Sequence, residues 1–450
     1  MKLNEDLINE HQLIFSDFFD RLMSIKSFDL NTMNSSIAVE RMMANQANNI
    51  KELQEAIKIS EDNLENGTEI KSEDNLIQFF VENIKYYQDG DKTGVKSDDP
   101  FIQSLFTKMN KNRKRINTEL EQHRGLILMN ICSTFEIFIS SLMKFELMNV
   151  YQNGAYITQN TISYKDIIEL GSIEKVKENL VEKLISDYQY EKLEDWVEYV
   201  FKICTSLNIS KKKRNEEVIK IWKKIESISV VFQKRNIFVH NNGIVNQIYL
   251  NNVKDSNLNI GDKVKLKNSE IVDIVDMILE FGADVFVLNM NKNKYFKDES
   301  YSTSLTEYLI GNVEQNPYIC KKFFVEMLNL DMKSIKSGHI DDTLKIFTGV
   351  DCINTWLSYD LMGSKDRFLI DFQSQYNIIR DLATEQPSIK FLDALIRNES
   401  TEKLFEVFEE VMGTYKSKTE KVNALDFPIF YSLRNEEKFI EYAKGIRYND

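Results

Sequence analysis

The sequence predicts an all-α protein, and three observations support that fold class. Only 4 prolines and 15 glycines occur in 450 residues, so positions that break helices are few. Apolar residues recur at three- and four-residue spacing over long stretches, as amphipathic helices require. The chain is 42% hydrophobic and 28% charged, which is typical of an ordinary globular protein. Its length exceeds what one hydrophobic core serves, so we expect two or three domains.

In the first hundred residues the spacing predicts helices over Leu7–Ile25, Ala38–Ile59 and Leu76–Tyr87. The segment 88–100, QDGDKTGVKSDDP, is polar, contains glycine and ends in Pro100. We interpret it as a loop and a domain boundary. The first expected domain is therefore an N-terminal helical region, residues 1–100.

A long helix is expected from about residue 102 to Val150, interrupted near Gly125. Its second half is apolar on most faces, which is typical of a central core helix. Further helices run to a long one that ends at His240, where Asn-Asn-Gly favours a helix end. Residues 259–268 read as a short extended turn, and Ser269 as the N-cap of the next helix.

These elements define a central helical domain, residues 101–295. From Leu305 onward we expect helices of about ten to fifteen residues with short connections, the pattern of an antiparallel helical array. No repeat of 34 residues is evident. The third expected domain, residues 296–450, is therefore a helical bundle or a solenoid-like array.

The net charge of −13 argues against a protein that coats nucleic acid nonspecifically. The charge is uneven, however. Residues 211–235 contain nine Lys or Arg against three Glu, and residues 108–124 contain six against two. Either run can be a solvated helix face. They are also the two candidate surfaces for an anionic partner.

Targeting and redox signals predict a cytoplasmic protein without a membrane span. The N-terminal MKLNEDLINEH is acidic and lacks the order of a signal peptide, and no run of about eighteen uninterrupted apolar residues occurs. Cys132, Cys204, Cys320 and Cys352 form no CxxC pair, so a structural zinc site is not expected. Cys132 and Cys204 stand in apolar helical context and are expected to be buried free thiols.

Arg235 is the first candidate for a functional side chain. On a regular helix, it falls within about 60° of an apolar stripe that contains Ile228, Val231 and Phe232, with Ile221 and Val239 on the same side. A guanidinium there cannot become neutral and needs an anion. Glu136 is the sequence's own candidate, because it shares a helix face with Met129, Cys132, Ile139 and Met143. Arg235 either pairs with Glu136 structurally or holds a phosphate with Glu136 behind it, and the two alternatives are compatible.

His240 is one of only four histidines. It stands five residues after Arg235, about 140° around and about 7.5 Å along a regular helix. The two side chains therefore diverge unless the helix end unwinds, and two copies related by a two-fold axis could bring them together more easily. A histidine at a helix C-terminus is suited to proton transfer near neutral pH. It can also simply cap the last carbonyl groups.

Four segments together resemble the HEPN superfamily over about residues 119–292. RNIFVHNNGIVNQIYL, beginning at Arg235, resembles its signature of Arg, a polar residue, a few apolar residues, His and a polar-Gly turn. STFEIFISSLMKFEL resembles its first core helix. Residues 173–209 resemble the variable middle helices of its ribonuclease-type prokaryotic branch, and residues 259–286 the turn and last helix. The expected fold is thus a HEPN-like helical bundle with helical regions on both sides.

The resemblance implies a metal-independent RNA endonuclease without a cofactor. Such domains dimerise and place two Arg…His motifs in one cleft, where the ribose 2′-hydroxyl attacks its own phosphate. Arg235 would then stabilise the phosphorane, Asn236 would help to position it, His240 would move the proton and Glu136 would support Arg235. Expected RNA contacts are Lys211, Lys212, Lys213, Arg214, Lys224, Arg113, Lys114 and Arg115. Antiphage defence or a toxin role is the implied biology.

Two alternatives remain open. Some members of the superfamily are inactive, so the chain can be a non-catalytic module that binds protein, RNA or nucleotide. It can also be a toxin restrained by an antitoxin or a sensor partner, with Tyr249 as a conceivable target of modification.

Overall fold

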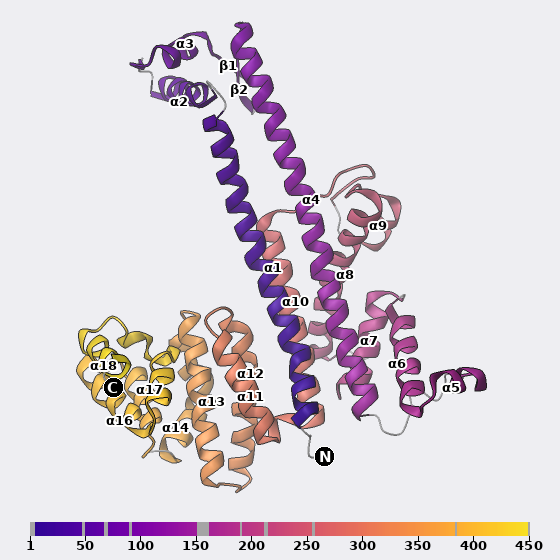
Figure 1. The fold of residues 1–450 in the computed structure, drawn as a ribbon, viewed down its shortest axis with the longest axis vertical. Coiled ribbons are helices and arrows are strands. Elements are labelled where there is room, and N and C mark those ends of the chain that lie inside the picture. The colour runs from indigo at the N-terminus through magenta and orange to yellow at the C-terminus, as the bar shows by residue number, and fades with distance from the viewer. Residues whose placement is uncertain are drawn as a thin grey trace. The chain divides into compact units, whose positions relative to one another are not determined.

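The computed structural model describes residues 5–46, 50–66, 71–89, 92–150, 162–189, 191–210, 215–253, 257–382 and 385–448. The chain is 81% helical, with two short strands in the part described. This confirms the all-α class (Figure 1).

The helices and strands have the following bounds: α1 Glu5–Gln46, α2 Ile50–Asn66, α3 Asn75–Asn83, β1 Lys85–Asp89, β2 Lys92–Lys96, α4 Pro100–Phe145, the π-helical turn η1 Glu146–Val150, α5 Tyr164–Leu170, α6 Ile173–Gln189, α7 Leu193–Cys204, α8 Glu216–Asn241, α9 Gln247–Asn252, α10 Asn268–Asn293, the 3₁₀ turn η2 Tyr295–Lys297, α11 Glu299–Asn312, α12 Pro317–Lys336, α13 Asp342–Leu361, α14 Lys365–Leu382, α15 Pro387–Ile396, α16 Thr401–Thr414, α17 Lys418–Leu425, the 3₁₀ turn η3 Pro428–Leu433 and α18 Glu437–Tyr448.

Two compact units divide the chain, and each combines distant segments. Unit 1 consists of residues 1–18, 138–222 and 279–450, and unit 2 of residues 19–137 and 223–278. The long helices α1, α4, α8 and α10 contribute residues to both units. The three sequence ranges 1–100, 101–295 and 296–450 remain predictions about which parts can fold alone.

Residues 88–100 are not a loop, in contrast to the sequence prediction. They contain most of an antiparallel hairpin in which Lys85 pairs with Lys96 and Tyr86 with Val95. The prediction gave too much weight to polar composition, and the helix expected to reach Tyr87 ends at Asn83, so Lys85–Asp89 forms the first strand instead. A small core beneath the hairpin buries Leu53, Ala56, Ile77, Phe80, Ile84, Ile102 and Leu105.

Gly125 does not interrupt α4, which is helical throughout Pro100–Phe145. The reason for a glycine at this position is the ring of Phe238, since a Cβ on Gly125 would lie 3.1 Å from Phe238 Cδ1. Gly243 meets the same ring from the end of α8, where an added Cβ would be 3.0 Å from Phe238 Cε1. Both glycines thus make room for one aromatic side chain of unit 2.

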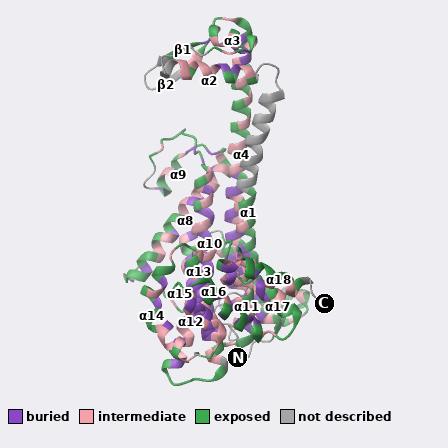
Figure 2. Cartoon of the chain, turned by 90° about the vertical axis from the view of Figure 1, so that its left-hand side faces the viewer, coloured by how far each residue is buried: buried purple, intermediate pink, exposed green. Residues whose placement is uncertain are grey.

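In unit 1, the C-terminal helices form an array of sequential neighbours, as predicted, but α12, α13 and α14, with 20, 20 and 18 residues, are longer than expected. Helix α13 packs against α12, α14 and α15, and α15 packs against α16. Side-chain caps define several helix starts, such as Asn316 for α12 and Asp341 for α13. A core of α15–α18 is centred on the fully buried Phe408 and Met412, and Figure 2 shows these helices with one buried and one exposed side.

A buried polar network joins the start of α1 to η1, α7, α10 and α11 within unit 1. His11 is fully buried, with Nδ1 2.7 Å from the Tyr301 hydroxyl and Nε2 2.7 Å from Asn289 Oδ1. Asn289 Nδ2 donates to Glu146 Oε1 at 2.7 Å and to the Cys204 carbonyl at 2.8 Å. Because the Asn289 amide nitrogen donates to these two acceptors, its Oδ1 faces the histidine and must accept a hydrogen bond. His11 Nε2 therefore carries the proton, and the Tyr301 hydroxyl donates to His11 Nδ1.

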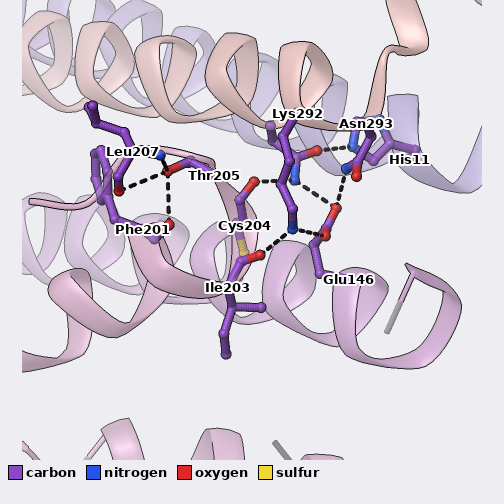
Figure 3. Close-up of polar contacts among 10 residues, drawn as sticks. His11, Glu146, Phe201, Ile203, Cys204, Thr205, Leu207, Lys292 and Asn293 are labelled. Atoms are coloured by element: carbon purple, nitrogen blue, oxygen red, sulfur yellow. Dashed lines mark hydrogen bonds and ion pairs between the residues drawn. The ribbon is translucent and has the colours of Figure 1, made fainter. Parts of the chain in front are cut away.

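Glu146 is the anionic centre of that network (Figure 3). Its side chain is fully buried and accepts from Lys292 Nζ at 2.8 Å and from Asn293. Lys292 also donates to the Ile203 carbonyl at the end of α7. A buried charge is tolerated when it is paired and hydrogen-bonded in this way. Glu146 therefore holds the ends of α4, α7 and α10 together in unit 1.

One described segment, Pro100–Val150, is long and apolar enough to cross a membrane by length and composition. In its most apolar window, 56% of the residues are buried inside the protein. This burial favours the predicted central core helix as the explanation of its composition. All four cysteines are buried free thiols, as expected for Cys132 and Cys204.

The buried His11 predicts a loss of stability in acid. Desolvation by burial lowers its pKa to about 3, against a hydrogen bond to Asn289 that raises it. The unfolded chain binds this proton below about pH 6.5 and the folded chain does not, so stability is full above that pH and falls as the pH drops toward 3. Unfolding free energy should decrease by about 2 kcal/mol between pH 7 and pH 5 from this group. Urea titrations measure it.

The control is His11→Gln, which cannot be protonated. It should be less stable than wild type at pH 7 but should lose less stability on acidification. An equal acid dependence in both proteins would contradict the assignment.

Candidate functional site

The predicted site residues Glu136, Arg235, Asn236 and His240 all belong to unit 2. Helix α8 presents the expected apolar stripe, since Ile228, Val231 and Phe232 are buried. Val239 departs from the prediction, because its side chain is 45% exposed. On this face the buried stripe therefore ends before Val239, near the level of Arg235.

Arg235 pairs with Glu136, as the helix geometry predicted. Arg235 Nη2 lies 3.2 Å from Glu136 Oε1 and 3.3 Å from Oε2. One nitrogen is thus shared between both oxygens, and both contacts are longer than the about 2.8 Å of a forked Arg–carboxylate pair. The side chains are 26% and 29% exposed, respectively. This geometry holds the guanidinium without enclosing it.

Asn236 holds the other arm of the same guanidinium. Arg235 Nη1 donates to Asn236 Oδ1 at 3.1 Å. Three contacts within the described residues involve the two terminal nitrogens, whereas a guanidinium has five N–H groups. Arg235 can therefore accept an additional anion without leaving Glu136.

Burial controls the chemistry of the neighbouring α4 side chains. It raises the pKa of Glu136, and the nearby Arg235 cation only partly opposes that effect. Burial also raises the pKa of the Cys132 thiol to about 12. Cys132 is therefore a packed, unreactive thiol and not a nucleophile. Of these two α4 side chains, only Glu136 can provide an acidic group beside Arg235.

His240 is exposed near the end of α8, and the helix remains regular through Asn241. The helix end therefore does not unwind to bring His240 back to Arg235. Asn236 and His240, however, are four residues apart and lie on the same helix face, with about 5–6 Å between their Cβ atoms. Because Arg235 reaches Asn236, its guanidinium is turned toward the His240 side. Asn236 thus links the two groups more closely than the helix angles alone suggest.

A left-handed turn fixes the position of His240. Asn242 and Gly243 have φ angles of 50° and 77°, and the Gly243 N–H donates to the Ile237 carbonyl at 2.9 Å. The following segment folds back, with Ile244 bridged to Lys263, in agreement with the extended turn predicted there. Helix α10 already begins at Asn268, so Ser269 lies inside it and is not its N-cap. Tyr249, a conceivable target of modification, is buried.

The basic residues predicted to contact RNA differ in their exposure. Arg113, Lys114 and Arg115 are exposed on α4, and Arg115 pairs with Glu119 at 3.8 Å. Lys224 is half-buried on α8. Lys211, Lys212, Lys213 and Arg214 lie outside the described residues.

Some cations in the same runs have structural partners that the sequence did not reveal. Arg124 donates to the Leu266 carbonyl at 3.0 Å and to Asn268, and Lys234 pairs with Glu270. These contacts connect α4 and α8 to the start of α10 within unit 2. The surface of residues 113–115 is therefore the best-defined cationic patch among the described residues of these runs.

Exposed apolar side chains stand beside the candidate site, which the sequence analysis did not anticipate. Ile137, adjacent to Glu136, is 50% exposed, and Leu126 is 62% exposed. These two lie eleven residues apart on α4, which places them on one face of the helix. Val239 and Ile244 flank the end of α8 in the same way. In the sequence, the signal for this surface would have been apolar residues on a second face of each helix, in addition to the face expected to be buried.

Comparison with known proteins gives no match: no family model, no curated protein and no solved structure is similar to this chain.

The Arg235–Glu136 geometry predicts unequal effects of two substitutions on stability. Arg235→Ala leaves the Glu136 carboxylate partly buried without a cation, and should lower the free energy of unfolding by about 1–2 kcal/mol. His240→Ala removes an exposed side chain and should change it by less than about 0.5 kcal/mol. Urea unfolding at pH 7.5 measures both.

Glu136→Gln is the matched control. Combined with Arg235→Ala it should recover part of the loss, because no unpaired carboxylate remains. If the effects of Arg235→Ala and Glu136→Gln on the free energy of unfolding simply add in the double variant, the two side chains are not energetically coupled.

Proposed function

We propose that this protein is a metal-independent RNA endonuclease of the HEPN type, whose active unit is a homodimer. The observation that supports it best is the guanidinium of Arg235, held from two sides by Glu136 and Asn236 and still partly exposed. A cation fixed in this way, with unused N–H groups, is what stabilisation of a phosphorane requires.

The reaction needs two further functions, a proton-transfer group and access for RNA. His240 is exposed, one helical turn from Asn236, and its imidazole can exchange protons near neutral pH. The ribose 2′-hydroxyl loses its proton as its oxygen bonds to the adjacent phosphorus, and the bond from phosphorus to the 5′-oxygen breaks. The leaving oxygen takes up a proton. The products are a 2′,3′-cyclic phosphate and a 5′-hydroxyl.

A second copy completes the site. Within one chain, the regular helix separates the Arg235 and His240 backbones by about 140°. Pairing two α8 ends would bring additional Arg235 and His240 groups into one cleft and would cover Val239 and Ile244, which now expose apolar surface. The exposed Arg113, Lys114 and Arg115 are the proposed RNA-backbone contacts. The proposed biological role is antiphage defence or a toxin, restrained by an antitoxin or a sensor partner.

The alternative, a non-catalytic HEPN-like interaction module, is favoured by one observation. The pairing of Arg235 with Glu136 already satisfies the charge of the arginine. In that case Arg235 stabilises the fold, and His240 has no specific role.

RNA cleavage in EDTA separates these alternatives. Wild-type protein should cut single-stranded RNA and leave 2′,3′-cyclic phosphate ends, and His240→Ala should reduce the rate by about 100-fold or more because proton transfer is lost. His339→Ala is the matched control, since His339 is also exposed but lies in unit 1. Gel analysis with end-group mapping measures rates and products. Cleavage that requires magnesium and survives His240→Ala would refute the proposal.

The dimer is tested separately. Val239→Glu should place like charges across the proposed interface and weaken self-association at least tenfold, measured by sedimentation, with cleavage decreasing in parallel. The control is Ile370→Glu, which alters a highly exposed apolar residue of α14 in unit 1. Full RNA cleavage by a strictly monomeric Val239→Glu protein would contradict the composite site.

A further inference from the structure

A cavity of about 300 Å³ in unit 1 contains two carboxylates that have no cationic partner among the described residues. It is lined by η2 and α11, by α12 and by α13. Asp331 comes from α12, and Asp351 from the facing side of α13. The residues Leu344, Phe347 and Asp351 recur at helical spacing, so one face of α13 forms this wall.

Both carboxylates are poorly satisfied. Asp351 is 5% exposed, and within the described residues its carboxylate has no hydrogen bond and no ion pair. Oδ2 of Asp331 is buried without a hydrogen-bond partner in the same part of the chain. Native proteins rarely leave buried carboxylates unpartnered, because removing a charged group from water without a compensating partner is destabilising.

The electrostatics of the pair follow from this burial. Burial raises the pKa of Asp331 to about 6, against a hydrogen bond to Thr348 that lowers it. Burial also raises the pKa of Asp351 well above its usual value, and the nearby Asp331 raises it further. The pair therefore retains protons that an entering cation would displace. The other charged groups that line the cavity are Lys297, Glu299 and Asp341.

We propose that this cavity binds a small organic cation, an ammonium or guanidinium group on a short apolar body. The charged group would lie between Asp331 and Asp351 and donate to their unpartnered oxygens. The apolar body would pack against the lining side chains Phe296, Met327, Leu330, Leu344 and Phe347. A volume of about 300 Å³ is at the small end of ligand pockets.

An organic cation fits better than a metal ion. Calcium takes six to eight oxygen ligands and magnesium about six. Among the described residues, no group of three or more His, Cys, Asp or Glu side chains could hold a metal ion, and apolar side chains make up much of the cavity wall. This proposal does not depend on RNA cleavage, since its residues are separate from Arg235 and His240.

Thermal unfolding with defined probes tests the site. At pH 7.5, a saturating concentration of benzylamine should raise the unfolding midpoint of the full chain by about 5 °C. Agmatine, which carries a guanidinium, should also stabilise the protein. Benzyl alcohol, the uncharged analogue of benzylamine, and calcium chloride should have little effect. No stabilisation by either amine, or equal stabilisation by benzyl alcohol or calcium, would overturn the proposal.

Substitutions locate the effect. Asp351→Asn and, as a second variant, Asp331→Asn should each abolish the benzylamine shift, whereas Asp360→Asn should retain it. Asp360 is an exposed aspartate on the same helix, outside the cavity. A shift that persists in both cavity variants would refute the site, as would its loss in Asp360→Asn.

The unliganded protein gives an independent readout. The pKa values of Asp331 and Asp351 are raised in the folded protein. The contribution of these two groups to the free energy of unfolding is therefore full at low pH and is lost as the pH rises through about 6. Asp351→Asn removes one of these acids, so it should raise the unfolding midpoint more at pH 7.5 than at pH 5. A decrease at both pH values would indicate a structural carboxylate and contradict an unoccupied cation site.

Discussion

The permanent positive charge of Arg235 is the constraint on which the account of unit 2 depends. It projects from a helix face whose neighbours, Val231 and Phe232, are buried, and a guanidinium cannot give up its charge there. Glu136 from α4 and Asn236 from α8 hold it at 3.1–3.3 Å. The same contacts that make the charge tolerable also hold the guanidinium beside Asn236, one helical turn before the exposed His240, so stability and the proposed chemistry depend on the same contacts.

Buried or partly buried charges are paired to different extents at three places in the protein. In unit 1, Glu146 is fully satisfied by Lys292, Asn289 and Asn293, which makes it a structural centre. In unit 2, the contacts of Arg235 are long and leave donors unused. At Asp351 the carboxylate has no partner among the described residues. Complete pairing indicates a structural role, and incomplete pairing indicates room for a ligand.

Short-range patterns predicted much of the helical fold and the Arg235–Glu136 pair, because helical periodicity alone places both residues on apolar faces. The hairpin of Lys85–Asp89 and Lys92–Lys96 was missed, because its second strand, KTGVK, is short and mostly polar. Gly125 was misread as a break, since its reason is the distant ring of Phe238. The network of His11 and the cavity that contains Asp331 and Asp351 bring together residues from different helices, and no local pattern reveals such contacts. The catalytic roles remain predictions.

Chemical rescue tests the central claim most directly, that the Arg235 cation contacts the reacting phosphate. Arg235→Ala protein, shown to be folded, is assayed for RNA cleavage with added guanidinium at concentrations well below those that unfold proteins. The account predicts that guanidinium restores a substantial part of the lost rate in this variant and none in His240→Ala. Folded Arg235→Ala that cleaves RNA at the wild-type rate, or that no concentration of guanidinium rescues, would contradict it.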